Sequence, residues 1–291
     1  MRKFKNIAII GRRNSEHLIQ QVKTLANCLQ EIGCNTYLDS SVSAGAMYAG
    51  HNCGKLAEWI EQIDLAIVIG GDGTMLSAGR EIVDHGIPIV GINQGKLGFM
   101  TDIAVGDMST TIQDMLLNDQ YLQEERSLLC GQIIRNDQSV YTSLALNDIV
   151  ISRGAIGSMI EFAMSINNEF VHSQKSDGVI FATPTGSTAY SLAAGGPILH
   201  PHSKVFSIVP ICPQSMSNRP IVISDEVSID LNLVRDTPAI IHYDGQEYFD
   251  LHFRDQIIIT KAKYPLKLLH PIGYNYYNTL RTKLYWSQRV S

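Results

Sequence analysis

The chain has 291 residues, of which 45% are hydrophobic, and its formal net charge is -5 at pH 7. This length and composition suffice for a full hydrophobic core and suggest about two domains. The acidic balance and the scattered basic residues exclude a basic nucleic-acid-binding surface. We expect neither a membrane span nor a signal peptide, because no apolar run is long enough for either. Five cysteines without C-x-x-C spacing indicate reduced thiols and a cytoplasmic protein.

Residues 1–125 alternate between strand patterns and helix patterns. The predicted strands cover residues 5–11, 35–39, 65–69 and 87–92, and the predicted helices cover residues 18–32, 56–63, 74–83 and 108–117. Gly33 is expected to end the first helix, and residues 40–54, rich in small side chains, to form a loop. This alternation predicts a doubly wound, Rossmann-like parallel sheet with ligands at the carboxyl ends of its strands.

The pattern turns to β after about residue 125. Val-, Ile- and Phe-rich segments predict strands at residues 127–135, 139–152, 159–167, 169–174, 177–182, 205–210, 220–234, 238–243 and 256–264. We therefore expect an α/β domain over residues 1–125 and a β-rich, sandwich-like domain over residues 126–264. The aromatic-rich tail, residues 265–291, is expected to pack back on the first domain.

The turn Gly70-Gly71-Asp72-Gly73-Thr74 follows the predicted strand at 65–69. Glycine reaches positive φ and lets a ligand approach the backbone, and Thr74 is a suitable N-cap for the next helix. The helix start would present N–H groups to an anion such as phosphate. A carboxylate beside phosphates is repelled unless a cation or a proton transfer involves it. Asp72 is therefore a metal contact or a general base, and the alternative is an ordinary tight turn.

Two other candidates for chemistry are weak. The segment from Gly91 to Leu97 resembles a P-loop, but it is one residue too short and has Leu97 where Ser or Thr would bind Mg²⁺. His200 and His202 flank Pro201 in a predicted loop, where a surface role is more common than metal ligation. We therefore expect neither a Walker site nor a histidine metal site, and we assign no residue as a metal ligand.

Further segments follow the motif order of one family. They are residues 93–102, 147–148, 176–180, 182–197, 210–213, 217–220 and 244–246. The first of these segments follows a predicted strand and is expected at the same sheet edge as the Gly70–Thr74 turn. Together with Gly-Gly-Asp-Gly, these segments make nearly the whole chain resemble the bacterial NAD kinases. Gly-Gly-Asp-Gly also occurs in lipid kinases and phosphofructokinases, whereas the sequence Thr-Pro-Thr-Gly-Ser-Thr-Ala-Tyr-Ser from Thr183 to Ser191 is far more selective.

The resemblance implies an ATP-dependent kinase that phosphorylates the 2′-hydroxyl of the adenosine ribose of NAD to give NADP. Asp72 inherits the role of general base, NAD and ATP are the substrates, and a divalent cation, Mg²⁺, is required. The resemblance also implies homodimers or homotetramers whose sites share residues through the β-rich domain. A lipid or sugar kinase and a non-catalytic NAD sensor are the alternatives. A lipid or sugar kinase would leave the motifs of the β-rich domain unexplained, and a non-catalytic sensor would not need Asp72.

The resemblance carries over a set of ligand contacts. They are Asp72, Gly73, Asn147, Asp148, Ser158, Lys175, Asp177, Thr188, Ala189, Tyr190, Ser191, Leu192, Ala193 and Gln246. Asn147 and Asp148 would grip adenine and ribose, although many relatives have Glu at the second position and an Asx turn is the alternative.

Several of these contacts have a second interpretation. Lys175 stands where Arg is common and so lacks the planar fork of a guanidinium. Residues 188–193 would open a helix toward the ligand, with Tyr190 either stacked on a base or packed in the core. Gln246 is a nicotinamide-side contact or an ordinary polar residue of a hairpin turn. Gly98, Phe99 and Thr101 would line the phosphate cleft, and packing is the alternative for Phe99.

Overall fold

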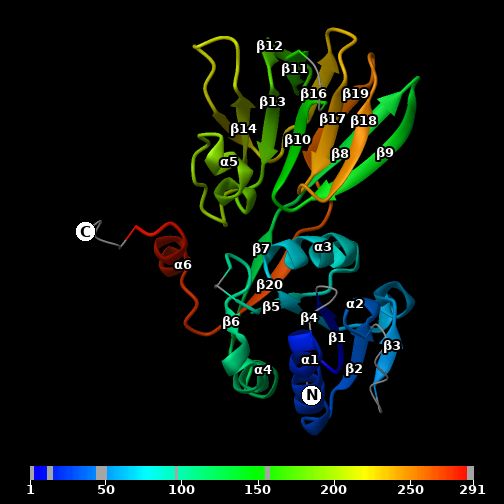
Figure 1. Ribbon diagram of the computed structural model, residues 1–291, viewed down its shortest axis with the longest axis vertical. Coiled ribbons are helices and arrows are strands. Elements are labelled where there is room, and N and C mark those ends of the chain that lie inside the picture. The colour runs from blue at the N-terminus through cyan, green and yellow to red at the C-terminus, as the bar shows by residue number, and fades with distance from the viewer. Residues whose placement is uncertain (1–2, 12–15, 44–50, 96–97, 155–157, 287–291) are drawn as a thin grey trace. The chain divides into compact units, whose positions relative to one another are not determined.

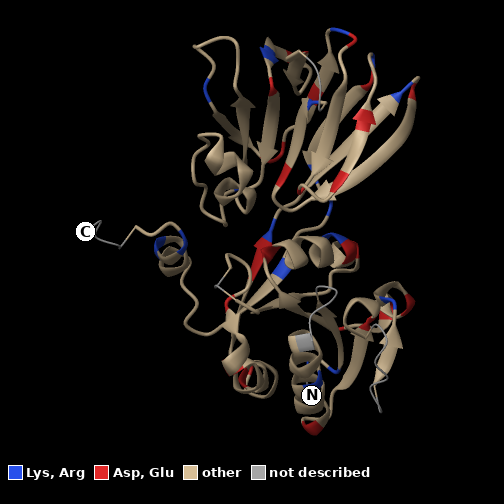
Figure 2. Ribbon diagram, in the orientation of Figure 1, with Lys and Arg blue, Asp and Glu red and all other residues tan. Residues whose placement is uncertain are grey.

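The computed structural model describes residues 3–11, 16–43, 51–95, 98–154 and 158–286. The chain forms two compact units (Figure 1). Unit 1 comprises Met1–Glu125 and Leu266–Ser291, and unit 2 comprises Arg126–Pro265. Lys and Arg residues and Asp and Glu residues are distributed over both units (Figure 2). Within the described residues, no helix is long and apolar enough to cross a membrane.

Unit 1 is built on one mostly parallel sheet, as the sequence predicts. Its strand order is β3-β2-β1-β4-β5-β20-β7, and β6 also pairs with β5. The strands are β1 Asn6–Gly11, β2 Asn35–Asp39, β3 Asn52–Gly54, β4 Leu65–Gly70, β5 Ile89–Asn93, β6 Ile103–Ala104, β7 Tyr121–Arg126 and β20 Leu266–Pro271. Because β20 lies between β5 and β7, the end of the chain completes the first sheet (Figure 1). The expectation that the tail packs back on the first domain is thereby confirmed.

The helices of unit 1 each bury part of their side chains. They are α1 Glu16–Glu31, α2 Ser40–Ser43, α3 Asp72–Ile82, α4 Met108–Leu117 and α6 Tyr276–Lys283, with 3-10 turns η1 Leu56–Glu58, η2 Ile60–Gln62, η3 Val83–His85 and η4 Val105–Asp107. Of these helices, α1, α2, α3 and α4 contact strands of this sheet. In α1, Leu18, Val22 and Leu25 recur at helical spacing and join the core with β1 and β4. The helix ends as predicted at Gly33, which has φ 76°.

Some local predictions for unit 1 were wrong. The predicted loop at 40–54 contains α2 and β3, and the part of it at 44–50 lies outside the described residues. The predicted helix at 56–63 is two 3-10 turns, separated at Trp59, which has a φ of -127°. The strand β7 was missed because its sequence, Tyr-Leu-Gln-Glu-Glu-Arg, has no apolar alternation.

Unit 2 consists of two antiparallel sheets that share one core, which confirms the predicted β-rich architecture. Their strand orders are β15-β14-β13-β10-β17-β18 and β12-β11-β16-β19-β8-β9. The strands are β8 Leu129–Arg135, β9 Gln138–Ala145, β10 Asp148–Arg153, β11 Ile160–Ile166, β12 Glu169–Ser176, β13 Gly178–Ala182, β14 Val205–Ile211, β15 Ile221–Ser224, β16 Ile229–Leu233, β17 Ala239–Tyr243, β18 Glu247–Leu251 and β19 Gln256–Lys261. Inward-facing residues of both sheets, such as Phe162 and Phe181, form the core.

Tight turns set the register of these sheets. The hairpins β8–β9, β11–β12 and β17–β18 each turn on two residues of positive φ, namely Asn136-Asp137, Asn167-Asn168 and Asp244-Gly245. The single strands predicted at 139–152 and 220–234 are each two strands, because the chain crosses from one sheet to the other between them. One such crossing, at residues 146–147, lies next to the candidate site in unit 2.

Candidate active site

The Gly-Gly-Asp-Gly turn joins the end of β4 to the start of α3. The helix begins at Asp72, and Gly71 is its N-cap with φ -115° and ψ -175°, so the predicted N-cap role of Thr74 is wrong. Thr74 instead packs against Gly70, where an added Cβ would lie 2.6 Å from its Oγ1. The glycine at position 70 is therefore needed for space, and Asp72 takes the favourable first position of the helix.

Two backbone N–H groups hold the carboxylate of Asp72. Phe99 donates to Oδ2 at 2.9 Å and Met100 donates to Oδ1 at 3.0 Å. Gly98 lies so close that an added Cβ would be 2.2 Å from Oδ1. Because each carboxylate oxygen has two lone pairs, each keeps one for a further donor. The carboxylate is thus fixed in orientation and able to accept a hydroxyl proton.

Residues 98–102, called here the Asp72 loop, are anchored on β5. The register of the parallel strands pairs Gly70 with Asn93, so both motif segments start at the same edge of the sheet, as expected. Asn93 Nδ2 donates to Thr101 Oγ1 at 2.8 Å, and Thr101 is fully buried. Gly98 N–H closes the loop on the carbonyl of Thr101 at 3.0 Å. Lys96 and Leu97 of the same motif lie outside the described residues.

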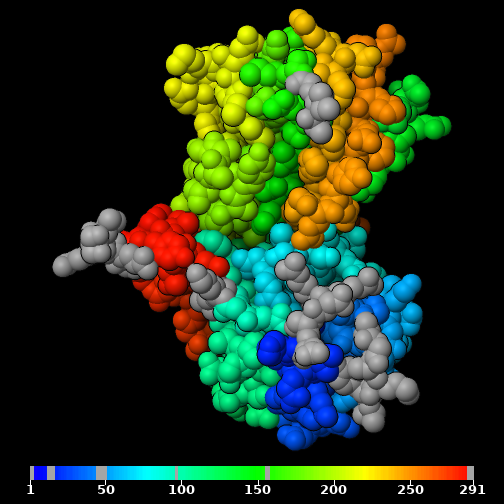
Figure 3. Space-filling view, in the orientation of Figure 1, coloured from blue at the N-terminus to red at the C-terminus, as the bar shows by residue number. Residues whose placement is uncertain are grey.

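Phe99 also contacts the C-terminal helix. The Nζ of Lys283 in α6 lies 6.0 Å from the centre of the Phe99 ring, a cation–π contact. The helix α6 is part of the red segment in Figure 3. Phe99 is half-buried, so the structure gives its ring a packing role inside unit 1.

Unit 2 contains a cavity of about 450 Å³ that gathers four of the predicted contacts. Its lining consists of Asn147, Asp148, Val150, Ser152, Ala189, Tyr190, His242, Asp244 and Gly245. Tyr190 is 48% exposed, which contradicts the core interpretation and leaves its ring open to stacking. A cavity of this size with a few convergent polar groups is typical of a small-molecule site.

Asp244 organises the backbone of this cavity. Its carboxylate accepts N–H groups from Leu146 at 3.0 Å, Asn147 at 2.7 Å and Asp148 at 3.2 Å. From the other side, the hydroxyl of Thr183 donates to the carbonyl of Leu146 at 2.5 Å. Residues 146–148 are therefore fixed between the β17–β18 hairpin and the Thr-Pro-Thr-Gly segment.

The close fit of the Thr-Pro-Thr-Gly segment explains its glycine. A Cβ on Gly186 would lie 2.0 Å from the carbonyl oxygen of Asn147. Only a residue without a side chain lets the segment approach this closely. The helix predicted after Gly186 is short, a 3-10 turn η5 Gly186–Thr188 followed by α5 Tyr190–Ala193.

Burial and a like charge act together on Asp148. Its side chain is 5% exposed. Two effects raise the pKa of Asp148 to about 7: the larger is the loss of hydration, and the smaller is the nearby charge of Asp244. A carboxyl group with this pKa is present in both protonation states near neutral pH. Asp148 can then donate or accept a hydrogen bond toward a ligand in the cavity.

The remaining predicted contacts do not line this cavity. They are Ser158, Lys175, Asp177, Thr188, Ser191, Leu192, Ala193 and Gln246, all in unit 2, and Asp72 and Gly73, which belong to unit 1. Asp177 follows β12 and pairs with Arg153 at 3.1 Å. Ser191 is fully buried, while Gln246 is exposed in the β17–β18 turn.

Sequence reasoning missed three polar residues of the cavity. Asp244 stands in a motif that was recognised, but its role as an acceptor for residues 146–148 depends on a contact between distant segments. Ser152 and His242 lie on neighbouring strands, where Val150 pairs with His242 and Ser152 with Ile240. Alternation along β10 would place Asp148, Val150 and Ser152 on one face, so that signal was available.

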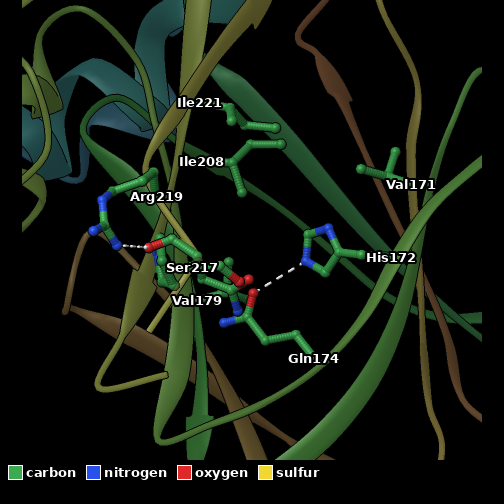
Figure 4. A pocket seen from close by; sticks show the side chains of 10 residues that line it. Val171, His172, Gln174, Val179, Ile208, Ser217, Arg219 and Ile221 are labelled. Carbon is green, nitrogen blue, oxygen red and sulfur yellow. Dashed lines mark hydrogen bonds between the residues drawn. The ribbon is translucent and has the colours of Figure 1, made fainter. Parts of the chain in front are cut away.

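A second, smaller cavity of about 260 Å³ lies elsewhere in unit 2 (Figure 4). Val171, Val179, Ile208 and Ile221 give it apolar walls, and Ser217, Asn218 and Arg219 bring in the segment 217–220. In Figure 4 the ring of His172 points toward Gln174, whose Oε1 lies 3.0 Å from the His172 Nε2. The cavity spans β12 and β15, which are edge strands of the two sheets.

Comparison with known proteins gives the same family over the whole chain. The model of the ATP-NAD kinase N-terminal domain matches residues 7–121, and that of the C-terminal domain matches residues 146–271. An NAD kinase from Chromobacterium violaceum is 46% identical over 99% of both chains, and one from Laribacter hongkongensis is 43% identical over 99% of this chain and 98% of its own. The chain belongs to the NAD kinase family.

Solved structures show the same fold. Yeast NADH kinase in complex with NADH gives a TM-score of 0.90 over 99% of this chain and 90% of its own, at 22% identity. An NAD kinase from Archaeoglobus fulgidus in complex with ATP gives 0.73 over 96% and 98% of the two chains, at 24% identity. At these identities the likeness concerns the fold.

The raised pKa of Asp148 predicts an unusual dependence of stability on pH. The folded chain keeps this proton up to about pH 7, whereas an ordinary aspartate with pKa 3.8 releases it, so stability falls as pH rises between these values. Asp148→Asn should therefore raise the free energy of unfolding by about 2 to 4 kcal/mol at pH 8 and leave it nearly unchanged at pH 4. Denaturant unfolding at both pH values measures this.

The control for this experiment is Asp250→Asn, an exposed aspartate on β18. Its effect on stability should be small and similar at the two pH values. If Asp148→Asn behaves like this control, the carboxyl group of Asp148 is ionised at ordinary cost and the assigned pKa is wrong.

Proposed function

We propose that this NAD kinase transfers the γ-phosphoryl group of ATP to the 2′-hydroxyl of the adenosine ribose of NAD, with Asp72 as the general base. The observation that carries this proposal is the carboxylate of Asp72, fixed by the N–H groups of Phe99 and Met100 at the start of a helix. Family membership weighs against the alternative of a lipid or sugar kinase.

The proposed reaction is a direct displacement. The ribose hydroxyl donates a hydrogen bond to Asp72, and its oxygen forms a bond to the γ-phosphorus as the bond to the oxygen bridging to ADP breaks. The hydroxyl proton passes to Asp72, and ADP leaves with its bridging oxygen. Because an alcohol is a weak acid, the carboxylate first orients the hydroxyl and takes its proton late in the transfer.

The cavity of unit 2 supplies a binding place for the dinucleotide in this proposal. Asn147 and Asp148 would bind adenine and ribose, since an amide offers both donors and acceptors and Asp148 changes protonation near neutral pH. The exposed ring of Tyr190 would stack on a base. Ser158, Lys175, Asp177, residues 188–193 and Gln246 remain proposed contacts for the rest of the ligand.

We propose that the divalent cation, Mg²⁺, is bound mainly by the phosphates of ATP. Mg²⁺ commonly uses one or two protein carboxylates together with substrate phosphates. In the part of the chain that the structure describes, no three His, Cys, Asp or Glu side chains form a metal-binding group. The bound cation would neutralise charge on the transferring phosphoryl group.

We also propose that the chain assembles as a homodimer or homotetramer through unit 2. Apolar side chains are exposed along the edges at β12 and β15, on both sides of the smaller cavity. They are Phe170 and Val171 on β12, Ile221 and Val222 on β15, and Met216, which is 91% exposed, in the segment before β15. Exposed apolar groups on edge strands are costly in a monomer and typical of an interface.

An activity assay tests the proposed reaction. Purified protein with NAD and Mg-ATP should form NADP, detected by an NADP-specific dehydrogenase. Asp72→Asn should lower kcat by about 100-fold or more and leave NAD binding in calorimetry nearly unchanged, because the base acts in the transition state. Parallel reactions with NADH and with polyphosphate define the acceptor and the donor.

Two results would contradict the proposal. NADP formation by Asp72→Asn at the rate of the unaltered chain would remove Asp72 from the role of base. Tight NAD binding without turnover by the unaltered chain would favour the sensor.

Light scattering tests the proposed assembly. The unaltered chain, 32.2 kDa, should have two or four times this mass in solution. Val222→Asp on β15 should shift the protein toward the monomer, because a charge in an apolar interface is costly. Val140→Asp, on the opposite sheet edge at β9, should leave the mass unchanged. Equal masses for both variants would place the interface elsewhere.

A further inference from the structure

A buried histidine lies between two carboxylates in unit 1. The Nδ1 of His270 is 2.8 Å from Asp102 Oδ2, and its Nε2 is 2.8 Å from Glu124 Oε1. The ring is 1% exposed and stacks on Tyr274 at 3.7 Å between centroids. A neutral imidazole donates from only one nitrogen, so the imidazolium form satisfies both carboxylates.

The three partners come from distant parts of the chain. His270 is on β20, Glu124 is on β7, and Asp102 ends the Asp72 loop. The second oxygen of Asp102, Oδ1, is buried and has no hydrogen-bond partner within the described residues. His270 is therefore the group that compensates the burial of this carboxylate, and an unpaired buried carboxylate is strongly destabilised.

The position of Asp102 determines the position of the two backbone N–H groups that bind the carboxylate of Asp72. Asp102 directly follows Thr101, whose carbonyl accepts from Gly98 N–H at 3.0 Å. Within this closed loop, the N–H groups of Phe99 and Met100 donate to Asp72. A shift of Asp102 toward water would pull the loop and change the orientation of the Asp72 carboxylate.

We propose that His270 is a positioning residue for phosphoryl transfer, which holds Asp72 in its reactive orientation through Asp102 and the Asp72 loop. This inference rests on the proposed role of Asp72 as the base. The ring of His270 touches Asp102, Glu124 and Tyr274, and it acts on the reaction only through the loop.

The same contacts predict the direction of a pH effect. Burial would lower the pKa of His270, but hydrogen bonds to Asp102 and Glu124 and their charges outweigh burial and raise it above the ordinary value of 6.5. The contribution of the protonated His270 ring to kcat is fully present below the ordinary histidine pKa. It is lost as pH rises through the raised pKa of His270. Loss of kcat on the alkaline side should therefore include deprotonation of His270.

Two substitutions separate the two sides of the ring. The side-chain nitrogen of Asn occupies the place of Nδ1, and that of Gln occupies the place of Nε2. His270→Asn thus keeps a donor for Asp102, whereas His270→Gln keeps a donor for Glu124. We expect His270→Asn to retain kcat within about threefold and His270→Gln to lower it by about 10-fold to 100-fold, since a misplacement of about 1 Å can have such an effect.

The measurements are kcat and KM for NAD over a pH series, with thermal unfolding of each variant. KM should change little in both variants, and the alkaline loss of kcat due to His270 should be absent in His270→Asn. Both variants lose one hydrogen bond and one charge, so their losses of stability should be similar. Equal losses of kcat, or a larger loss in His270→Asn, would overturn the proposal.

If either His270 variant does not fold, the carboxylates provide the same comparison. Asp102→Ala should lower kcat, whereas Glu124→Ala should lower stability and leave kcat nearly unchanged. The opposite order would overturn the proposal. The variant Asp72→Asn keeps the two inferences separate. Turnover by this variant would refute the proposed role of Asp72 as the base. If this variant is inactive and the two His270 substitutions have equal effects, only the role of His270 is refuted.

Discussion

The two N–H groups that Phe99 and Met100 donate to the carboxylate of Asp72 are the constraint on which the proposed chemistry depends. The carboxylate of an aspartate at the start of a helix can rotate, and in most orientations it cannot accept the proton of a substrate hydroxyl. Two donors from one rigid loop remove this freedom and leave one lone pair on each oxygen for the substrate. Gly70 and Gly98 make room for this arrangement, since a side chain at either position would collide with its neighbours.

The fold divides the proposed tasks between the two units. In unit 1, parallel strands end at one sheet edge, so the Gly70–Thr74 turn after β4 and the segment 93–102, which contains the Asp72 loop, start side by side. In unit 2, the crossing between the two sheets leaves residues 146–147 between strands, and Asp244 and Thr183 bind their polar backbone groups. Each site thus uses backbone groups that regular secondary structure leaves open.

The sequence predicted the architecture well where apolar periodicity is strong. The strands β1 and β4 and the helix α1 have clear patterns, and the hairpin turns carry Asn, Asp or Gly. It failed at β7, which is highly charged, and at the start of α3, which begins at Asp72 with Gly71 as its N-cap instead of the expected Thr74. Contacts between distant segments, such as Asp244 with 146–148 and His270 with Asp102, leave no local pattern and became visible only in the structure.

A double-mutant cycle tests most directly whether the Asp72 loop acts through the carboxylate of Asp72. Gly98→Ala introduces a Cβ that would lie 2.2 Å from Asp72 Oδ1, and it should lower kcat for NADP formation by about 10-fold or more in the unaltered background. In the Asp72→Asn background the residual kcat should hardly change when Gly98→Ala is added, because no base remains to be displaced. If the two losses instead multiply, the loop acts independently of Asp72 and the account is contradicted.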